Sequence, residues 1–143
     1  MRIPPAGLFA LAAGAQIFLG RLSTSRFLPA APLVAVSGGL GVVAVGQFAR
    51  AGTTMDPVRL GRSSALVTDG VLGYTRNPMY LALAGALTAH AVARGSWWAL
   101  VPVAGFVWAA GPQIAAEEAA LRRRFGVEYE AYARRVPRWI RLR

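Results

Sequence analysis

The chain has 143 residues, a formal net charge of +10, 55% hydrophobic residues and a mean hydropathy of +0.43. All sixteen basic residues are arginines, there is one histidine, and there is no cysteine. These counts exclude disulfides, thiolate catalysis and histidine-cluster metal sites, and arginines gathered between apolar blocks are typical of a polytopic membrane protein.

Four apolar segments are predicted to form helices. The first, residues 6–20, is short and rich in small residues, but the apolar segments after it favour a transmembrane helix over a signal peptide. The second, residues 27–49, is long enough to span a bilayer with some tilt. Residues 79–94 form the third, which is slightly short for a full span, and residues 99–114 form the fourth. A short glycine–serine turn joins the last two as an antiparallel helical hairpin.

The C-terminal part of the chain differs in character, since it is charged and amphipathic after residue 114. Glu118 and Arg122 have the i, i+4 spacing of a helical ion pair. Gly126 is expected to end this helix, and a second short helix should follow it. Trp139, with arginines on both sides, has the pattern of an amphipathic anchor at an anionic lipid surface.

We therefore predict an all-α fold, with one membrane domain over residues 1–143, about four transmembrane helices and a C-terminal amphipathic helical tail. Its expected parts are two N-terminal spans (1–49), a cytoplasmic cofactor loop (50–77), a helical hairpin (78–114) and a cytoplasmic helical tail (115–143). With four spans, thirteen of the sixteen arginines share the side of the loop and tail. The positive-inside rule then places that side in the cytoplasm, most simply of a prokaryotic inner or plasma membrane.

One polar stretch, residues 66–80, reads LVTDGVLGYTRNPMY. Asn77 is a good helix N-cap and Pro78 suits the first helical position, so a helix is predicted to begin there. The free N–H groups and partial positive charge of a first helical turn suit an anionic group of a ligand. The alternative interpretation is a capped loop between two helices.

An acidic pair, Glu117 and Glu118, ends the fourth apolar segment and is expected at the same membrane face as the polar stretch. A carboxylate near a membrane is costly unless it has a partner or a ligand. The pair could equally cap the helix or form ion pairs with arginines.

The succession TxGxxxxxRNPMY, a helical hairpin and EExxLxxxFGxEYxxYxxxVPRW resembles the isoprenylcysteine carboxyl methyltransferase and phospholipid methyltransferase superfamily of integral membrane enzymes. The resemblance covers about residues 53–140. It implies an enzyme that transfers a methyl group from S-adenosylmethionine to a lipophilic or small-molecule acceptor, such as an isoprenylcysteine-like carboxylate or a lipid. The composition itself indicates no metal, and because the arginines flank apolar spans, no nucleic acid is expected as a partner.

The resemblance also implies the site residues. Glu117 and Arg76 are the implied catalytic residues, and Gln113 the implied substrate contact. Glu117 can offset the positive groups of the cofactor, and Arg76 can hold its carboxylate. The implied cofactor-binding residues are Ser64, Ala65, Leu66, Val67, Leu72, Asn77, Pro78, Met79, Tyr80, Glu117 and Glu118.

Three positions depart from the pattern of the prenylcysteine enzymes. Asn77 replaces a histidine, Leu72 an aromatic residue, and Gln113 an arginine that meets the substrate carboxylate. Because glutamine cannot supply that charge, the acceptor stays open among lipid amines, isoprenoid carboxylates, quinol-like hydroxyls and small thiols. Two other functions are weighed beside methyl transfer: a membrane reductase of the steroid-reductase type that uses NADPH, and a non-catalytic membrane scaffold.

Overall fold

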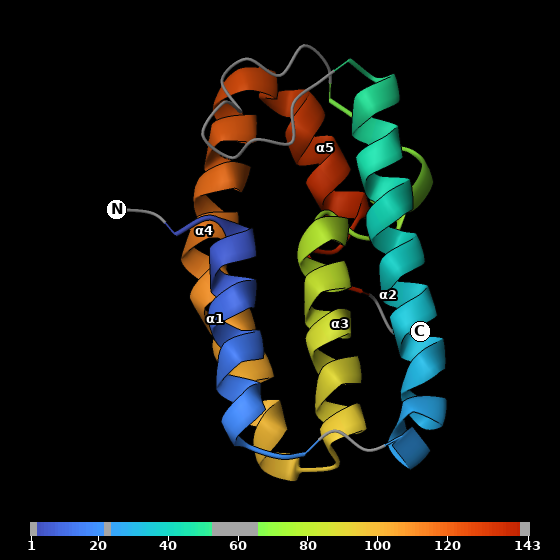
Figure 1. Ribbon diagram of the computed structural model, residues 1–143. Helices are drawn as coiled ribbons and strands as arrows, with labels where there is room; N and C mark the ends of the chain where they lie inside the picture. Colours follow the sequence, from blue (N-terminus) through green and yellow to red (C-terminus); the bar gives the residue numbers. More distant parts are fainter. Residues whose placement is uncertain (1–2, 22–23, 53–65, 141–143) are drawn as a thin grey trace. The chain divides into compact units, whose positions relative to one another are not determined.

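The structure is a computed structural model that describes residues 3–21, 24–52 and 66–140. All regular elements of these residues are helical, which confirms the predicted all-α class (Figure 1). In chain order they are α1 (Pro5–Phe18), α2 (Thr24–Arg50), η2 (Gly70–Gly73), α3 (Pro78–Arg94), η3 (Trp97–Leu100), α4 (Val101–Phe125) and α5 (Val127–Arg135).

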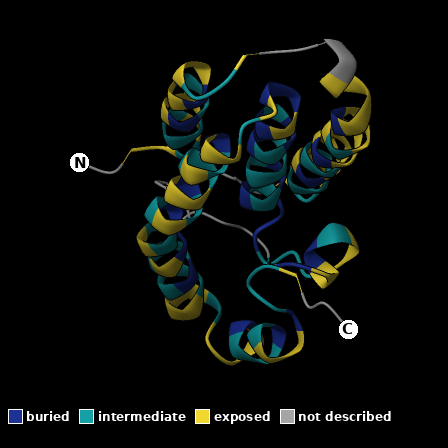
Figure 2. Cartoon of the chain, turned by 90° about the horizontal axis from the view of Figure 1, so that it is seen from below, coloured by how far each residue is buried: buried dark blue, intermediate teal, exposed yellow. Residues whose placement is uncertain are grey.

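Packing divides the chain into two compact units. The first unit contains Met1–Gly39 and Tyr80–Gly111, and the second contains Leu40–Met79 and Pro112–Arg143. Figure 2 shows that the helices carry both buried and exposed residues, as expected where each helix buries only one face.

Local chemistry sets several of the helix boundaries. Pro78 begins α3, as predicted, because its fixed φ suits the first helical position and it has no N–H to leave unpaired. Gly126 separates α4 from α5 and has a φ of 50°, which glycine adopts without the steric cost of a Cβ. Gly95, with a φ of 60°, makes the predicted turn after α3.

Two helices among the described residues are long and apolar enough to cross a membrane, Arg26–Arg50 and Trp97–Phe125. Only 17% and 22% of their most apolar windows is buried in the protein. By length, α1 reaches about 21 Å and α3 about 26 Å, against about 30 Å of bilayer hydrocarbon. Two of the four expected spans thus have support, and the other two, like the amphipathic tail, stay predictions.

Small residues bring helices of the first unit close together. A Cβ added to Gly85 of α3 would collide with the hydroxyl of Ser37 on α2, which is itself buried. Close approach of this kind gives membrane helices van der Waals contact where lipid supplies no hydrophobic drive.

A polar chain crosses the first unit and links α1, α3 and η3. Gln16 of α1 has 0% exposure, and its amide donates to the carbonyls of Leu87 at 2.9 Å and Ala99 at 2.7 Å. Its Oε1 lies 2.7 Å from Nδ1 of His90, whose Nε2 accepts from Nε of Arg94 at 3.1 Å. Because Arg94 can only donate, this arrangement requires neutral His90 with its proton on Nδ1.

Candidate functional site

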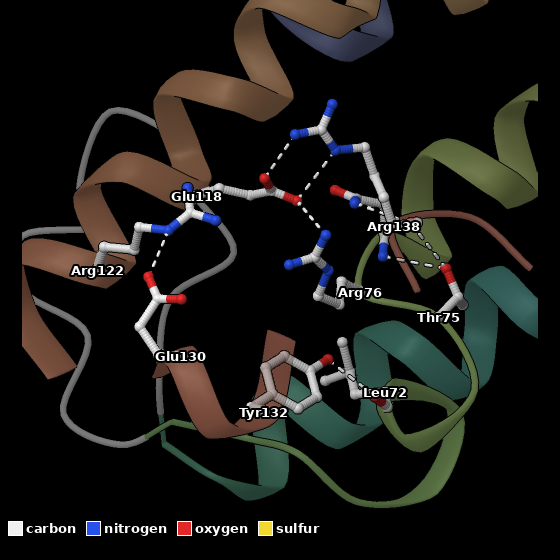
Figure 3. Close-up of polar contacts among 9 residues, drawn as sticks. Leu72, Thr75, Arg76, Glu118, Arg122, Glu130, Tyr132 and Arg138 are labelled. Carbon is white, nitrogen blue, oxygen red and sulfur yellow. Dashed lines mark hydrogen bonds and ion pairs between the residues drawn. The ribbon is translucent and has the colours of Figure 1, made fainter. Parts of the chain in front are cut away.

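The polar centre of the second unit is Glu118 on α4. Its side chain is only 4% exposed and lies between two arginines (Figure 3). Arg138 approaches it with two nitrogens, Nη2 at 2.6 Å from Oε2 and Nε at 3.1 Å from Oε1. Nη2 of Arg76 lies 3.2 Å from Oε1. We call Arg76, Glu118 and Arg138 the Glu118 cluster, and its sum of formal charges is one positive charge.

The pairing of Glu118 differs from the predicted i, i+4 pair with Arg122. Arg122 instead meets Glu130 of α5, with Nε and Oε1 2.7 Å apart, and both side chains are close to half exposed. The physical reason is burial: Glu118 faces the interior of the second unit, where a charge needs partners that are also withdrawn from water. The hydrogen bond to Glu118 raises the pKa of Arg138 above its ordinary value, so Arg138 stays charged.

Hydrogen bonds fasten the segment before α3 to the end of the chain. The backbone N–H of Arg76 donates to the carbonyl of Pro137 at 3.0 Å. The carbonyl of Arg138 accepts from the Thr75 hydroxyl at 3.2 Å and from the Asn77 side-chain amide at 3.0 Å. We call residues 75–77 the corner and residues 137–138 the C-terminal strap.

An aromatic cluster supports the strap from α5. Tyr129, Tyr132 and Val136 are buried together, and the partly buried side chains packed on them are those of Leu66, Leu121, Phe125 and Ala133. Tyr132 donates its hydroxyl hydrogen to the carbonyl of Leu72 in η2 at 2.8 Å. This cluster therefore ties the tail to the beginning of the polar stretch.

Both tyrosines of the cluster are held in the neutral form. Burial raises the pKa of Tyr129, the Glu118 carboxylate raises it further, and Arg76 and Arg122 oppose the rise. Burial also raises the pKa of Tyr132 well above its ordinary value, and the neighbouring Tyr129 adds to that rise. Each hydroxyl thus remains a hydrogen-bond donor at neutral pH.

Gln47, near the end of α2, holds the backbone of the segment that precedes the corner. Gln47 donates from Nε2 to the carbonyl of Asp69 at 3.0 Å and accepts at Oε1 from the N–H of Val71 at 3.0 Å. Between these two residues, Gly70 has a φ of 55°, and an added Cβ would collide with the Gln47 side chain. Glycine is therefore required here by both conformation and space.

The predicted site residues fall into several groups. The structure brings Arg76, Asn77 and Glu118 together through the contacts just described. Gln113 donates to Glu117 at 3.4 Å, one turn along α4. Leu66 packs against the aromatic cluster, and the carbonyl of Leu72 accepts the hydrogen bond of the Tyr132 hydroxyl.

The remaining predicted residues are placed as follows. Val67 and Met79 are half-buried and Pro78 is buried, all in the second unit. Tyr80 is 5% exposed and belongs to the first unit. Ser64 and Ala65 lie outside the described residues.

Residues that were not predicted as part of the site are Thr75, Tyr129, Tyr132 and Arg138. The last three lie in the motif EYxxYxxxVPRW, so their residue types were visible in the sequence. Their contacts with the corner were not, because no local spacing connects segments so far apart in the chain.

The described residues thus form an all-helical protein with two long apolar helices and a charged cluster around buried Glu118. The model of the phospholipid methyltransferase family matches residues 25–128, and the chain belongs to this family. No curated protein and no solved structure gives a significant match. The family and the two long apolar helices together indicate a membrane-associated methyltransferase.

Proposed function

We propose that the protein transfers a methyl group from S-adenosylmethionine to a lipophilic or small-molecule acceptor, at a site formed by the corner and the acidic pair of α4. The observation that carries this proposal is the ion pair between Arg76 and Glu118. It joins the two sequence motifs on which the resemblance depends, and both lie within or beside the residues that match the family.

The residues of the site fit the charges of this cofactor. Nε of Arg76 is buried and has no hydrogen-bond partner among the described residues. A buried guanidinium N–H without an acceptor favours an anionic oxygen nearby, and the Glu118 cluster has one surplus positive charge. We assign Arg76 to the cofactor carboxylate and partly exposed Glu117 to its positively charged groups.

When bound, the cofactor would supply an electrophilic methyl group. The protein's own contribution is to hold the reactants in line and to keep water away, which is where most catalysis of a displacement originates. The two long apolar helices are consistent with an acceptor that arrives from lipid. We propose that the site faces the cytoplasm at a prokaryotic inner or plasma membrane. With four spans, thirteen of the sixteen arginines lie on the side of the loop and tail, and the positive-inside rule assigns that side to the cytoplasm.

The test has a binding part and a transfer part. Purified full-length protein in detergent should bind S-adenosylmethionine and S-adenosylhomocysteine in calorimetry, and should show no heat with NADPH. Labelled S-adenosylmethionine incubated with membrane extracts of the host should then give a methylated product, which identifies the acceptor. Binding of NADPH in place of the adenosyl compounds would favour the reductase alternative, and binding of neither would favour a scaffold.

Variants locate the site. Glu117→Ala and Tyr80→Ala should each weaken cofactor binding about tenfold, the usual effect of losing one polar or π contact, while the helical content stays unchanged. Glu128→Ala is the matched control, because Glu128 is an exposed carboxylate on α5. Equal affinities in all four proteins would refute the assignment of these residues.

A further inference from the structure

We propose that Arg138 is a positioning residue of the site, which acts through Glu118 to aim Arg76. This inference rests on the proposed function and extends it to a part of the chain beyond the family match, which ends at residue 128. Arg138 follows that end by ten residues and lies in the C-terminal strap.

The first support is the way in which the two arginines share the carboxylate oxygens of Glu118. Arg138 engages both carboxylate oxygens, at 2.6 Å and 3.1 Å, whereas Nη2 of Arg76 lies 3.2 Å from Oε1 alone. A two-pronged arginine contact fixes the plane of a carboxylate as well as its position. The direction in which Glu118 presents Oε1 to Arg76 is therefore set by Arg138.

The second support is that residue 138 also holds the backbone of the corner. Its carbonyl accepts hydrogen bonds from Thr75 and Asn77, the residues on either side of Arg76. The Arg76 N–H donates to the neighbouring Pro137. Arg76 is thus restrained at its backbone by the strap and at its guanidinium by the carboxylate that the strap orients.

The third support is the contrast in exposure within the Glu118 cluster. The side chain of Arg138 is 41% exposed, whereas those of Arg76 and Glu118 are 12% and 4% exposed. Arg138 therefore closes the outer edge of the cluster, while Arg76 and its unpartnered Nε lie inside. An outer arginine in this arrangement is suited to orienting the inner one.

The test uses two ligands that differ in the amino-acid group, whose carboxylate Arg76 is proposed to hold. S-adenosylhomocysteine has the amino-acid carboxylate, and 5′-methylthioadenosine lacks the amino-acid group. Calorimetry on the full-length protein in detergent should show that Arg138→Gln weakens S-adenosylhomocysteine about tenfold, as expected for one misdirected charged hydrogen bond. Affinity for 5′-methylthioadenosine should change less than twofold, and Arg138→Lys, which keeps the charge, should recover part of the loss.

Two further variants separate positioning from loss of charge or loss of fold. Arg135→Gln removes an exposed tail charge near the strap and should leave both affinities unchanged. Thr75→Val keeps the side-chain shape but removes a donor to the Arg138 carbonyl, and should show the same ligand-selective loss.

The outcomes are distinct. If Arg138→Gln binds S-adenosylhomocysteine like the unaltered protein, or loses both ligands equally, Arg138 is not a positioning residue and the proposed function stands. If the unaltered protein binds neither ligand, the proposed function and this inference both fail.

Discussion

At the level of single residues, Glu118 is a buried charge of the second unit that pairs with two arginines. It is almost fully buried, and its carboxylate offsets two guanidinium groups. Removal of one member of a buried ion pair leaves uncompensated charge in a poorly solvated place, which is far more costly than loss of an exposed pair.

We therefore expect Glu118→Gln to lower the free energy of unfolding by about 3 kcal/mol. The control is Glu130→Gln, because Glu130 also pairs with an arginine but is 45% exposed, and it should cost less than about 1 kcal/mol. Denaturant unfolding in detergent, followed by circular dichroism, measures both. Equal losses in the two variants would contradict the expectation that the buried ion pairs of Glu118 contribute more to stability than the exposed pair of Glu130.

Tyr132 gives a prediction about alkaline pH. Its pKa in the folded protein is raised above the ordinary value of 10.0, since burial disfavours the phenolate. A raised pKa means that Tyr132 contributes stability below pH 10, and that this contribution is lost as pH rises through the folded pKa. Stability should therefore fall above pH 10, and it should fall less steeply in Tyr132→Phe.

The measurement is the phenolate absorbance during an alkaline titration, together with unfolding at pH 8 and pH 11. The difference between the titrations of the unaltered protein and Tyr132→Phe should lie above pH 10. At pH 8 the variant should lose about 1 kcal/mol with the hydrogen bond to Leu72. A difference curve centred below pH 10 would show that the Tyr132 hydroxyl is not buried as described.

At the level of elements, the polar chain of the first unit links three helical segments through one buried glutamine. Gln16→Leu would leave the carbonyls of Leu87 and Ala99 without this donor and His90 without its acceptor. We expect a loss of about 2 kcal/mol, since buried polar groups without partners are costly. Thermal unfolding in detergent would register it.

The matched control makes the same substitution at Gln47, whose bonds to Asp69 and Val71 lie in exposed and partly buried surroundings. Water can replace those bonds, so Gln47→Leu should cost clearly less than Gln16→Leu. The reverse order would mean that the polar chain does not hold the first unit together.

The helix boundaries at Pro78 and Gly126 were predictable from the sequence because they depend on neighbouring residues, whereas α4 continues past the predicted end of its apolar segment at residue 114 to Phe125. Pro78 and Gly126 act within one turn of chain, through φ preference and the absence of an N–H or a Cβ. The partners of Glu118 were not predictable in this way. Its i, i+4 neighbour Arg122 was an adequate local choice, but the fold brings Arg76 and Arg138 to it from outside α4.

At the level of the whole molecule, the resemblance in the sequence and the family match agree on a methyltransferase, whereas the number of spans depends on more than composition. Helices α1 and α3 are shorter than the hydrocarbon layer, so a crossing by either would require local thinning of the bilayer or compensation by neighbouring helices. Hydropathy alone contains none of these effects.

The absence of native cysteine makes the proposed orientation directly testable, because each introduced cysteine is the only thiol. Three exposed positions suffice: Trp97 in η3, Trp108 in α4 and Arg134 in α5. With the tail in the cytoplasm, a membrane-impermeant maleimide added to intact host cells should label Trp97→Cys. It should label Arg134→Cys only after permeabilisation.

Trp108→Cys is the internal control for burial in lipid. Trp108 is 83% exposed on the protein surface, so only surrounding lipid would keep a cysteine there from aqueous reagent. It should remain unlabelled in both conditions and react once the protein is unfolded in denaturing detergent. Labelling of Arg134→Cys in intact cells would invert the orientation, and labelling of Trp108→Cys before unfolding would remove α4 from the membrane.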